Sequence, residues 1–249
     1  MSEERDLILY YLKIHFSTLS EFELMDEQHD NINQMKRVVE LNPNLTPEER
    51  NILNVAYKNP VSSRRKTIAE LLNYIQVEQL DKLHPQRVAR LINFREQVAQ
   101  ELRDICFDLI NLIDQHLIPS SNEAEERVYY AKMKGDYYRY ICETYDDKSD
   151  IESIIQKAHD CYQTGLDIAK AELPQTNPTF LGLVLNYSVF LYDIMDHKDE
   201  AIELSSTTYS DTVDLIDASI NDDTYKEASI ILDLLRTNQA NWVKGRENE

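Results

Sequence analysis

The stretch "NPNLTPEERN" (residues 42–51) contains the clearest helix start in the sequence. Thr46 is a typical N-cap residue, Pro47 suits the first helical position, and Glu49 stands three residues after Thr46, as a capping box requires. Apolar residues with a helical period follow directly. The stretch therefore predicts a long amphipathic helix that begins at Pro47.

The same helical period continues through the rest of the chain. Roughly nine amphipathic stretches are separated by short breaks, and four further prolines mark three of them: Pro85, Pro119, and Pro174 with Pro178. Only 4 Gly and 7 Pro occur in 249 residues, which leaves little turn chemistry for a β-rich fold. Breaks this short join antiparallel neighbours. We therefore predict an all-α fold, a single domain of about nine antiparallel helices over residues 1–249.

The charge balance narrows the classes of partner. The 26 Lys+Arg residues face 45 Asp+Glu residues, and the net charge of −19 opposes general binding to nucleic acid or to anionic membranes. The N-terminus lacks a signal-peptide pattern, and no apolar run is long enough to cross a bilayer. The three scattered cysteines suit a reducing compartment. These features predict a soluble cytoplasmic protein, and they are also compatible with a nuclear location.

Catalytic and cofactor-binding patterns are missing from the sequence. The four glycines form no phosphate-binding loop. Asp26, His29 and Asp30 can share one helix face as a metal group, but such residues in an acidic protein are more often solvated. His159 and Cys161 suggest a nucleophile pair, yet side chains two apart on a helix diverge. We predict no enzyme, no metal and no cofactor.

A basic cluster stands out against the acidic background. In "KMKGDYYRY" (residues 132–140), Lys132, Asp136, Arg139 and Tyr140 fall at i, i+4, i+7 and i+8, on one stripe of a helix. The stripe combines two cations and a phenol hydroxyl with a carboxylate that can orient the arginine. The alternative is an ordinary solvated helix face.

A second pair of cations has a similar spacing. Lys58 and Arg65, in "AYKNPVSSRRK" (residues 56–66), are seven positions apart and also share a stripe. Two helices that each present such a pair could converge on one doubly charged anion. Arginine suits this task because its planar guanidinium binds phosphate through two hydrogen bonds.

Two strongly apolar helices each carry an unexpected asparagine, Asn186 in "GLVLNYSVFLYDI" (residues 182–194) and Asn238 in "ASIILDLLRTNQANW" (residues 228–242). The structural interpretation is a core helix with a satisfied amide. The functional interpretation is a groove in which the amides hold a peptide backbone. In that groove, apolar neighbours would contact the peptide side chains: Leu185, Val189 and Leu234.

These segments together resemble the 14-3-3 family, dimeric adaptors that bind phosphoserine and phosphothreonine. The similarity runs from about residue 35 to residue 242 and lies in the following segments: "RNILNVAYKN" (50–59), "ELRDIC" (101–106), "KMKGDYYRY" (132–140), "GLVLNYSVF" (182–190) and "YKEASIILDLLRTNQANW" (225–242). The resemblance implies a protomer of nine helices with a concave peptide-binding groove. It also implies phosphorylated proteins as partners.

The resemblance assigns a role to each candidate residue by position. The phosphate would be bound by Lys58, Arg65, Arg139 and Tyr140, with Lys132 beside them. Asn186 and Asn238 would bond to the peptide main chain. The groove wall would be formed by Leu185, Val189, Leu234 and Trp242, with Asp193 where the family has a glutamate that contacts the peptide.

Three positions in the predicted groove depart from the family pattern. Pro60 removes a backbone donor between Lys58 and Arg65 and predicts a kink in their helix. Ala69 stands where the family carries a further arginine of the pocket. Asn241 replaces an apolar groove residue, which should relax the preference for hydrophobic peptide positions.

The N-terminal region, residues 1–34, departs most, and the resemblance makes it the dimerisation region. The stretch "EQHD" (residues 27–30) replaces a motif resembling Arg-Tyr-Asp-Asp, whose arginine pairs with a glutamate of the second protomer. Glu101 appears in the place of that glutamate, so Glu27 and Glu101 would repel each other. Phe94 replaces an interface tyrosine. These changes predict a weakened or rearranged homodimer, or a heterodimer with a relative whose arginine could face Glu101 or Glu27.

Two other classes of protein compete with the adaptor. A tetratricopeptide-like helical scaffold would bind partners whether or not they are phosphorylated, and it would leave the paired cations unexplained. An enzyme acting on a phosphorylated small molecule would need a nucleophile or a metal beside the cations.

The segment "SSRRKT" has two interpretations. Its hydroxyl residues, Ser62, Ser63 and Thr67, either resemble a kinase substrate or form a solvated helix face. The tail, residues 243–249, offers no function.

Overall fold

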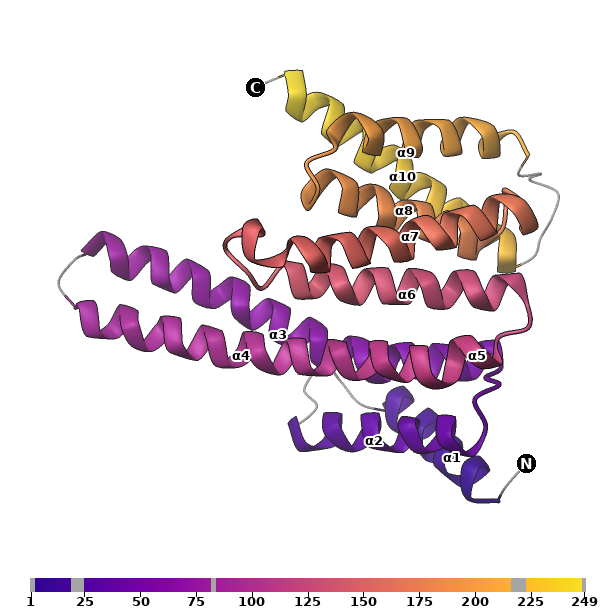
Figure 1. Cartoon of the computed structure of the whole chain (residues 1–249), viewed down its shortest axis with the longest axis horizontal. Coiled ribbons are helices and arrows are strands. Elements are labelled where there is room, and N and C mark those ends of the chain that lie inside the picture. The colour runs from indigo at the N-terminus through magenta and orange to yellow at the C-terminus, as the bar shows by residue number, and fades with distance from the viewer. Residues whose placement is uncertain (1–2, 19–24, 82–83, 216–222, 248–249) are drawn as a thin grey trace. The chain divides into compact units, whose positions relative to one another are not determined.

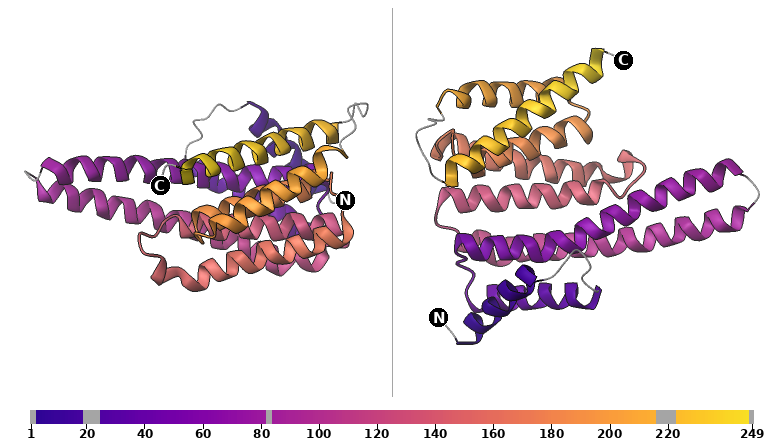
Figure 2. Two further views of the ribbon diagram at one scale, coloured as in Figure 1. Left: turned by 90° about the horizontal axis from the view of Figure 1, so that it is seen from above. Right: turned by 180° about the vertical axis from the view of Figure 1, so that it is seen from behind.

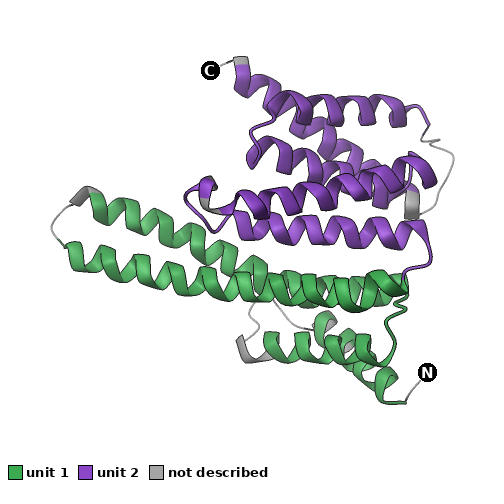
Figure 3. Cartoon of the chain, viewed as in Figure 1, with its two compact units in different colours: residues 1–120 green, residues 121–249 purple. Residues whose placement is uncertain are grey.

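The computed structural model describes residues 3–18, 25–81, 84–215 and 223–247, and within these ranges the secondary structure consists of helices without strands (Figure 1). The prediction of an all-α fold is confirmed. The chain divides into two compact units, residues 1–120 and residues 121–249 (Figure 3). The single domain over the whole chain stays a prediction.

The first unit contains α1 (Glu3–Thr18), α2 (Met25–Leu41), α3 (Pro47–Asp81) and α4 (Pro85–Leu112). A π-helical turn, η1 (Ile113–Leu117), and a last short piece, α5 (Ile118–Ser120), continue directly from α4, so this helix ends one residue beyond Pro119. The long helices α3 and α4 run side by side in both views of Figure 2. Successive helices pack against each other, as the short breaks predict.

The second unit contains α6 (Ala124–Cys142), a 3₁₀ turn η2 (Lys148–Ile151), α7 (Glu152–Glu172), α8 (Pro178–Asp193), α9 (Lys198–Val213) and α10 (Asp223–Glu247). In this unit α8 is central, because it packs against α6, α7, α9 and α10. If α4, η1 and α5 count as one helix, the described residues form nine long helices. Within the predicted tail, residues 243–249, the described residues 243–247 are helical and belong to α10.

Sequence signals fix the helix starts. At the start of α3, the backbone N–H of Glu49 donates to Thr46 Oγ1 (3.3 Å) and the backbone N–H of Thr46 donates to Glu49 Oε2 (2.9 Å). The predicted capping box is therefore confirmed. At the start of α8, the Asn177 side chain accepts hydrogen bonds from the next two N–H groups that follow Pro178, at 2.8 and 3.2 Å.

A buried ion pair fastens the N-terminal helix to the first unit. The Arg5 guanidinium donates two hydrogen bonds to the Glu49 carboxylate, both at 2.9 Å, and both side chains are almost fully buried. Glu49 thus caps α3 and anchors α1 with the same carboxylate. Sequence analysis missed this pair because Arg5 lies in the region that diverges from the family pattern.

Among the helices of the described ranges, none has an apolar stretch long enough to cross a membrane.

Candidate functional site

The predicted site residues are divided between the two units. Lys58 and Arg65 lie on α3 in the first unit, whereas Lys132, Arg139 and Tyr140 lie on α6 in the second. Convergence of the two groups on one phosphate stays a prediction, and each half is described separately below.

The second-unit half is organised around one buried carboxylate. Asp136, on α6, is only 6% exposed and accepts four hydrogen bonds. Lys132 Nζ donates to Oδ2 at 3.0 Å, and the Tyr162 hydroxyl on α7 donates to Oδ1 at 2.7 Å. The amide nitrogen of Asn186, on α8, donates to both oxygens, at 2.8 and 2.9 Å. One side chain therefore ties three helices together at the predicted phosphate cluster.

The charges around Asp136 keep it ionised. Burial alone would raise the pKa of Asp136, but the positive charges of Lys132 and Arg139 outweigh burial and hold the pKa below its ordinary value. A buried carboxylate that accepts several charge-assisted hydrogen bonds is a rigid anchor for its donors. The lysine is thereby held in place before any ligand binds.

Arg139 is held by four different groups. Its Nη1 donates to Glu143 at 3.1 Å, its Nε donates to the Tyr162 hydroxyl at 3.4 Å, and its Nη2 lies 3.7 Å from Asp136 Oδ1. The guanidinium also lies over the ring of Tyr140, 4.7 Å from its centroid. The carboxylate expected to orient this arginine is thus in place. Sequence analysis missed Glu143 and Tyr162.

Gly135 explains how Tyr162 reaches this position. A Cβ atom on Gly135 would lie 2.7–2.8 Å from atoms of the Tyr162 ring, closer than real side chains approach. The same ring is fully buried and stacks on Tyr187, with ring centroids 5.3 Å apart and an angle of 18° between planes. A glycine next to the site carboxylate thus makes room for the tyrosine that hydrogen-bonds to it.

The orientation of Asn186 follows from the chemistry of its partner. An ionised carboxylate only accepts hydrogen bonds, so the amide nitrogen of Asn186 must face Asp136. The nitrogen is satisfied within the fold, as the structural interpretation expected. The carbonyl oxygen takes no part in these bonds and is the atom with which Asn186 can accept a peptide N–H.

The remaining groove candidates lie on α8 and α10, which pack against each other. Leu185 and Val189 are half-buried on α8, Asp193 is exposed at its end, and Leu234 is exposed on α10. Asn238 and Trp242 are half-buried at i+4 and i+8 from Leu234. The Trp242 ring stacks on Tyr192 of α8, with centroids 4.6 Å apart and planes 10° apart. Sequence analysis did not identify Tyr192.

In the first unit, two consecutive arginines have different environments. Arg64 is only 3% exposed and donates to Glu101 on α4 (3.0 Å), to Gln28 on α2 (3.2 Å) and to the carbonyl of Pro60 (3.1 Å). Its neighbour Arg65 is half-buried, and Lys58 is exposed. Arg64 is therefore structural, whereas Lys58 and Arg65 are accessible to a ligand.

The contact between Arg64 and Glu101 changes the electrostatics expected at the N-terminal region. Glu101 was expected to face a second protomer with its charge unbalanced, but a cation of the same chain is 3.0 Å away. The side chain of Glu27 lies outside the described residues. Phe94 is exposed. The predicted repulsion between Glu27 and Glu101 should therefore be smaller than the sequence alone suggests.

The other positions singled out in the sequence lie mostly at the surface. Pro60 is buried inside the continuous helix α3, and its predicted kink stays a prediction. Ala69 and Asn241 are exposed, as are Ser62 and Ser63, while the Thr67 hydroxyl donates to the Ser63 carbonyl at 3.1 Å.

Two of the residues that sequence analysis considered for nucleophilic catalysis or metal binding, His159 and Asp30, have other partners in the structure. His159 Nδ1 lies 2.8 Å from the Tyr187 hydroxyl, so this nitrogen already has a partner other than Cys161. Asp30 accepts a hydrogen bond from Gln34, and the side chain of Asp26 lies outside the described residues.

Comparison with known proteins identifies a family. The model of the family described as "14-3-3 protein" matches residues 20–243. The chain is 41% identical over 244 residues to 14-3-3 protein 8 of Solanum lycopersicum, covering 97% of this chain and 89% of that protein. It is 42% identical over 209 residues to 14-3-3-like protein 2 of Caenorhabditis elegans (84% and 82% covered), and 38% identical over 215 residues to 14-3-3 protein zeta of Bombyx mori (86% and 85% covered).

Proposed function

Because the chain belongs to the 14-3-3 family, we propose that it is an adaptor that binds phosphoserine and phosphothreonine peptides and so regulates the proteins that carry them. The observation that supports this most directly is the set of donors fixed around Asp136. Lys132, Arg139 and Asn186 are held in place by hydrogen bonds or charge before a ligand arrives. Such preorganisation reduces the entropy lost on binding.

The proposed binding mode divides the peptide between phosphate and main chain. Lys58, Arg65, Lys132, Arg139 and Tyr140 bind the phosphate. The amides of Asn186 and Asn238 bond to the peptide backbone. The apolar side of the groove is formed by Leu185, Val189, Leu234 and Trp242, and Asp193 lies at its end. No step of this proposal needs a nucleophile, a metal or a cofactor.

Fluorescence anisotropy with a phosphoserine peptide and its unphosphorylated counterpart tests the proposal. Arg139→Ala should weaken binding of the phosphopeptide by roughly 10- to 100-fold, because it removes charge-assisted hydrogen bonds. The matched control is Arg127→Ala on the same helix, whose guanidinium pairs with Glu172 at 3.0 Å. Binding by Arg127→Ala should remain phosphate-dependent. Equal affinity for both peptides in the wild type would instead favour the scaffold that ignores phosphorylation.

We also propose that two copies of the chain associate through the first unit. Large apolar side chains are exposed on α1 and near the joined ends of α3 and α4: Leu7, Tyr10, Tyr11, Tyr74, Val77, Ile92 and Phe94. Exposed apolar groups of this kind typically mark association surfaces. Arg64 balances the charge of Glu101, but position 27 carries a carboxylate instead of the family's arginine, so the dimer should be weaker than an ion-paired one.

Sedimentation velocity measures this association. A monomer–dimer equilibrium should be visible at concentrations of about 1–10 μM. A dimer that survives dilution to about 1 nM would contradict the weakened interface, and a chain that stays monomeric at about 100 μM would contradict the association itself.

A further inference from the structure

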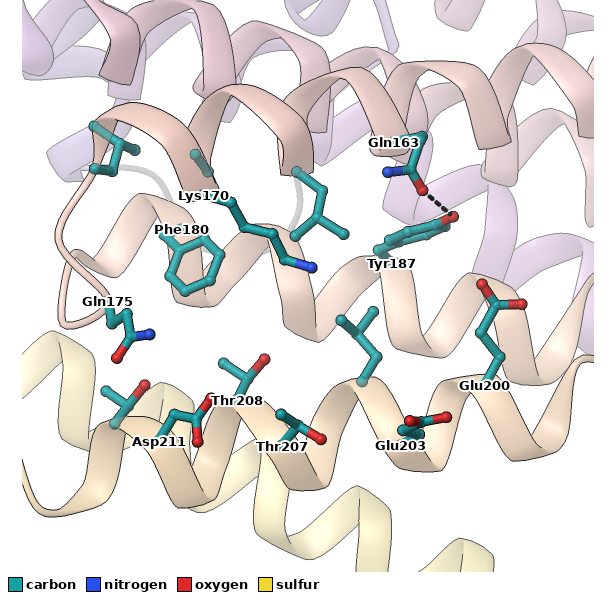
Figure 4. A pocket seen from close by; sticks show the side chains of 15 residues that line it. Gln163, Lys170, Gln175, Phe180, Tyr187, Glu200, Glu203, Thr207, Thr208 and Asp211 are labelled. Atoms are coloured by element: carbon teal, nitrogen blue, oxygen red, sulfur yellow. Dashed lines mark hydrogen bonds between the residues drawn. The ribbon is translucent and has the colours of Figure 1, made fainter.

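The second unit contains a cavity that none of the proposed peptide-binding residues lines. It has a volume of about 590 Å³ and lies between α7, α8 and α9 (Figure 4). On α8 it is lined by Phe180 and Tyr187, which are seven positions apart and share one face. Leu185 and Val189 each lie two positions from Tyr187, on nearly the opposite face of the helix. The cavity and the proposed groove thus use different faces of α8.

The cavity has an apolar part of the size of a small ligand. Its apolar lining is contributed by the following residues: Leu166, Ala169, Leu173, Phe180 and Leu204. Small-molecule sites typically enclose about 300–1,000 Å³, with mostly apolar walls and a few polar groups that fix orientation. Phe180 is buried, and Figure 4 shows its ring among the side chains that line the cavity. An apolar or aromatic body of modest size fits this lining.

The charged residues that line the cavity are predominantly acidic. Figure 4 shows Asp211, Thr208 and Gln175 together at the end near Phe180, while Glu200 and Glu203 lie at the end near Tyr187. The only cation among these lining residues is Lys170, whose side chain extends from α7 between the two ends. Three carboxylates therefore face one amine.

The carboxylate at the Phe180 end is available to a ligand. Within the described part of the chain, Asp211 and Lys170 form no ion pair, whereas Glu200 already lies 3.1 Å from His197 Nδ1. Thr208 is more than nine-tenths buried and lines the cavity one turn before Asp211, and its hydroxyl makes no hydrogen bond among the described residues. A buried hydroxyl without a partner indicates an unfilled polar contact at this end.

The backbone adds negative potential at the same end. Two helices terminate there, α7 at Glu172 and α9 at Val213, and a helix C-terminus carries a partial negative charge. The N-terminus of α8 also begins nearby, but the Asn177 side chain already accepts its first N–H groups. At the other end, burial and the negative charge of Glu200 raise the pKa of the Tyr187 hydroxyl, which agrees with a negative potential.

We propose that this cavity binds a small organic cation, an ammonium group carried on an apolar or aromatic body. The ammonium lies at Asp211 and donates to the carboxylate and to the hydroxyl of Thr208. The body lies against Phe180 and the leucines of α7 and α9. The site is independent of the proposed phosphopeptide groove, so the protein can hold both ligands at the same time.

The probe is 2-phenylethylamine, and two compounds with a similar aromatic body serve as comparisons. 2-Phenylethanol carries no charge, and 3-phenylpropanoate carries the opposite charge. Ligand-observed NMR or calorimetry should give a Kd of roughly 1–10 mM for the amine, as expected for so small a ligand. The alcohol should bind at least about fivefold more weakly, and the carboxylate should show no saturable binding. A saturating phosphopeptide should not displace the amine.

Two variants of opposite sign locate the site. Asp211→Asn should weaken amine binding about fivefold, a modest effect because this carboxylate is exposed to water. Lys170→Met should strengthen amine binding about threefold, because it removes the one repelling charge and keeps an apolar stem. Glu227→Gln, an exposed carboxylate on α10 outside the cavity, is the control for net charge and should change nothing. Circular dichroism checks that each variant is folded.

Several results would overturn the proposal. Equal binding of amine and alcohol would contradict it, as would the absence of saturable amine binding up to about 100 mM. So would an Asp211→Asn variant that binds like the wild type, or displacement of the amine by the phosphopeptide. Since these measurements use no phosphate-dependent readout, failure of the adaptor proposal and failure of the cavity proposal are distinguishable.

Discussion

Replacing Asp136 with asparagine tests whether one buried carboxylate organises the proposed phosphate site. The substitution keeps the shape of the side chain but removes its charge and converts one oxygen into an NH₂ group. Asp136 is the acceptor in all four of its hydrogen bonds, and each carboxylate oxygen accepts two of them. An asparagine can accept at only one of these two positions. If it accepts from Tyr162, then Lys132 and one bond from Asn186 lose their acceptor.

The expected loss of stability follows from these lost contacts. An unmade buried hydrogen bond costs about 1–3 kcal/mol, and breaking a buried charge pair costs about 3–5 kcal/mol. We therefore expect the free energy of unfolding of Asp136→Asn to fall by about 3 kcal/mol, and Tm to fall by roughly 6–12 °C. The affinity for phosphopeptide should fall about tenfold, because Lys132 and Asn186 are no longer held in place.

Thermal unfolding followed by circular dichroism and anisotropy binding measure the two effects. Asp160→Asn provides the control, because it makes the same change at an exposed carboxylate of α7 that accepts from Gln156 at 2.7 Å. Its unfolding free energy should stay within about 0.5 kcal/mol of the wild type. If Asp136→Asn matched this control in both stability and affinity, the carboxylate would have no organising role.

Acidification gives an independent check with a defined sign. The pKa of Asp136 in the folded protein lies below the ordinary value of 3.8, because Lys132 and Arg139 outweigh burial. Its contribution to stability is therefore complete above the unfolded pKa and is lost as the pH falls through the folded pKa. The difference in stability between the wild type and Asp136→Asn should be constant from pH 7 to about pH 5 and should shrink below about pH 4. A difference that persisted at low pH would indicate a packing effect instead of a charge effect.

Three further substitutions have definite expected outcomes. Gly135→Ala should displace the Tyr162 ring, since its Cβ would lie 2.7 Å from a ring atom; phosphopeptide affinity should fall about tenfold by anisotropy, and unchanged affinity would contradict the close approach. Thr46→Ala should lower the unfolding free energy by about 1 kcal/mol through loss of the N-cap, measured by urea titration. Arg5→Met should lower it by about 3 kcal/mol, because Glu49 stays buried without its partner, and a loss below about 1 kcal/mol would show that water reaches the carboxylate.

Local sequence patterns predicted the parts of the site that belong to a single helix. The stripe from Lys132 to Tyr140 needs only the helical period, and the structure places the whole stripe on α6. The capping box at Thr46 is equally local. The contact between Asp136 and Asn186 joins residues fifty positions apart and exists only because α6 packs against α8. Neither spacing nor composition specifies that packing, so sequence analysis identified both residues and missed their contact.

The sequence also could not predict which of two neighbouring, identical residues is buried. Arg64 and Arg65 are consecutive and chemically identical, yet the first is enclosed by α2 and α4 while the second is half-exposed. Their side chains point about 100° apart around α3, and only the neighbouring helices decide which of them is enclosed. The resemblance to a known family selected Arg65. It did not reveal that Arg64 would balance the charge of Glu101.

Charge counting in the second unit supports the proposal that cations of α3 also bind the phosphate. In the second unit, the two cations Lys132 and Arg139 already face two carboxylates, Asp136 and Glu143. This cluster is close to neutral, so by itself it offers a phosphate hydrogen bonds but little net attraction. The proposal therefore requires the two cations of α3, Lys58 and Arg65, to reach the same phosphate.

The double substitution Lys58→Gln/Arg65→Gln tests that requirement with neutral side chains of similar length. Phosphopeptide affinity should fall about 100-fold, to the level of the unphosphorylated peptide, because the remaining cluster has no excess positive charge. Lys66→Gln, at an exposed neighbouring position on α3, is the control for net charge and should bind normally. If the double variant kept its phosphate dependence while Arg139→Ala lost it, the second unit would bind phosphate by itself. The local carboxylates would then have to release their cations when the ligand arrives.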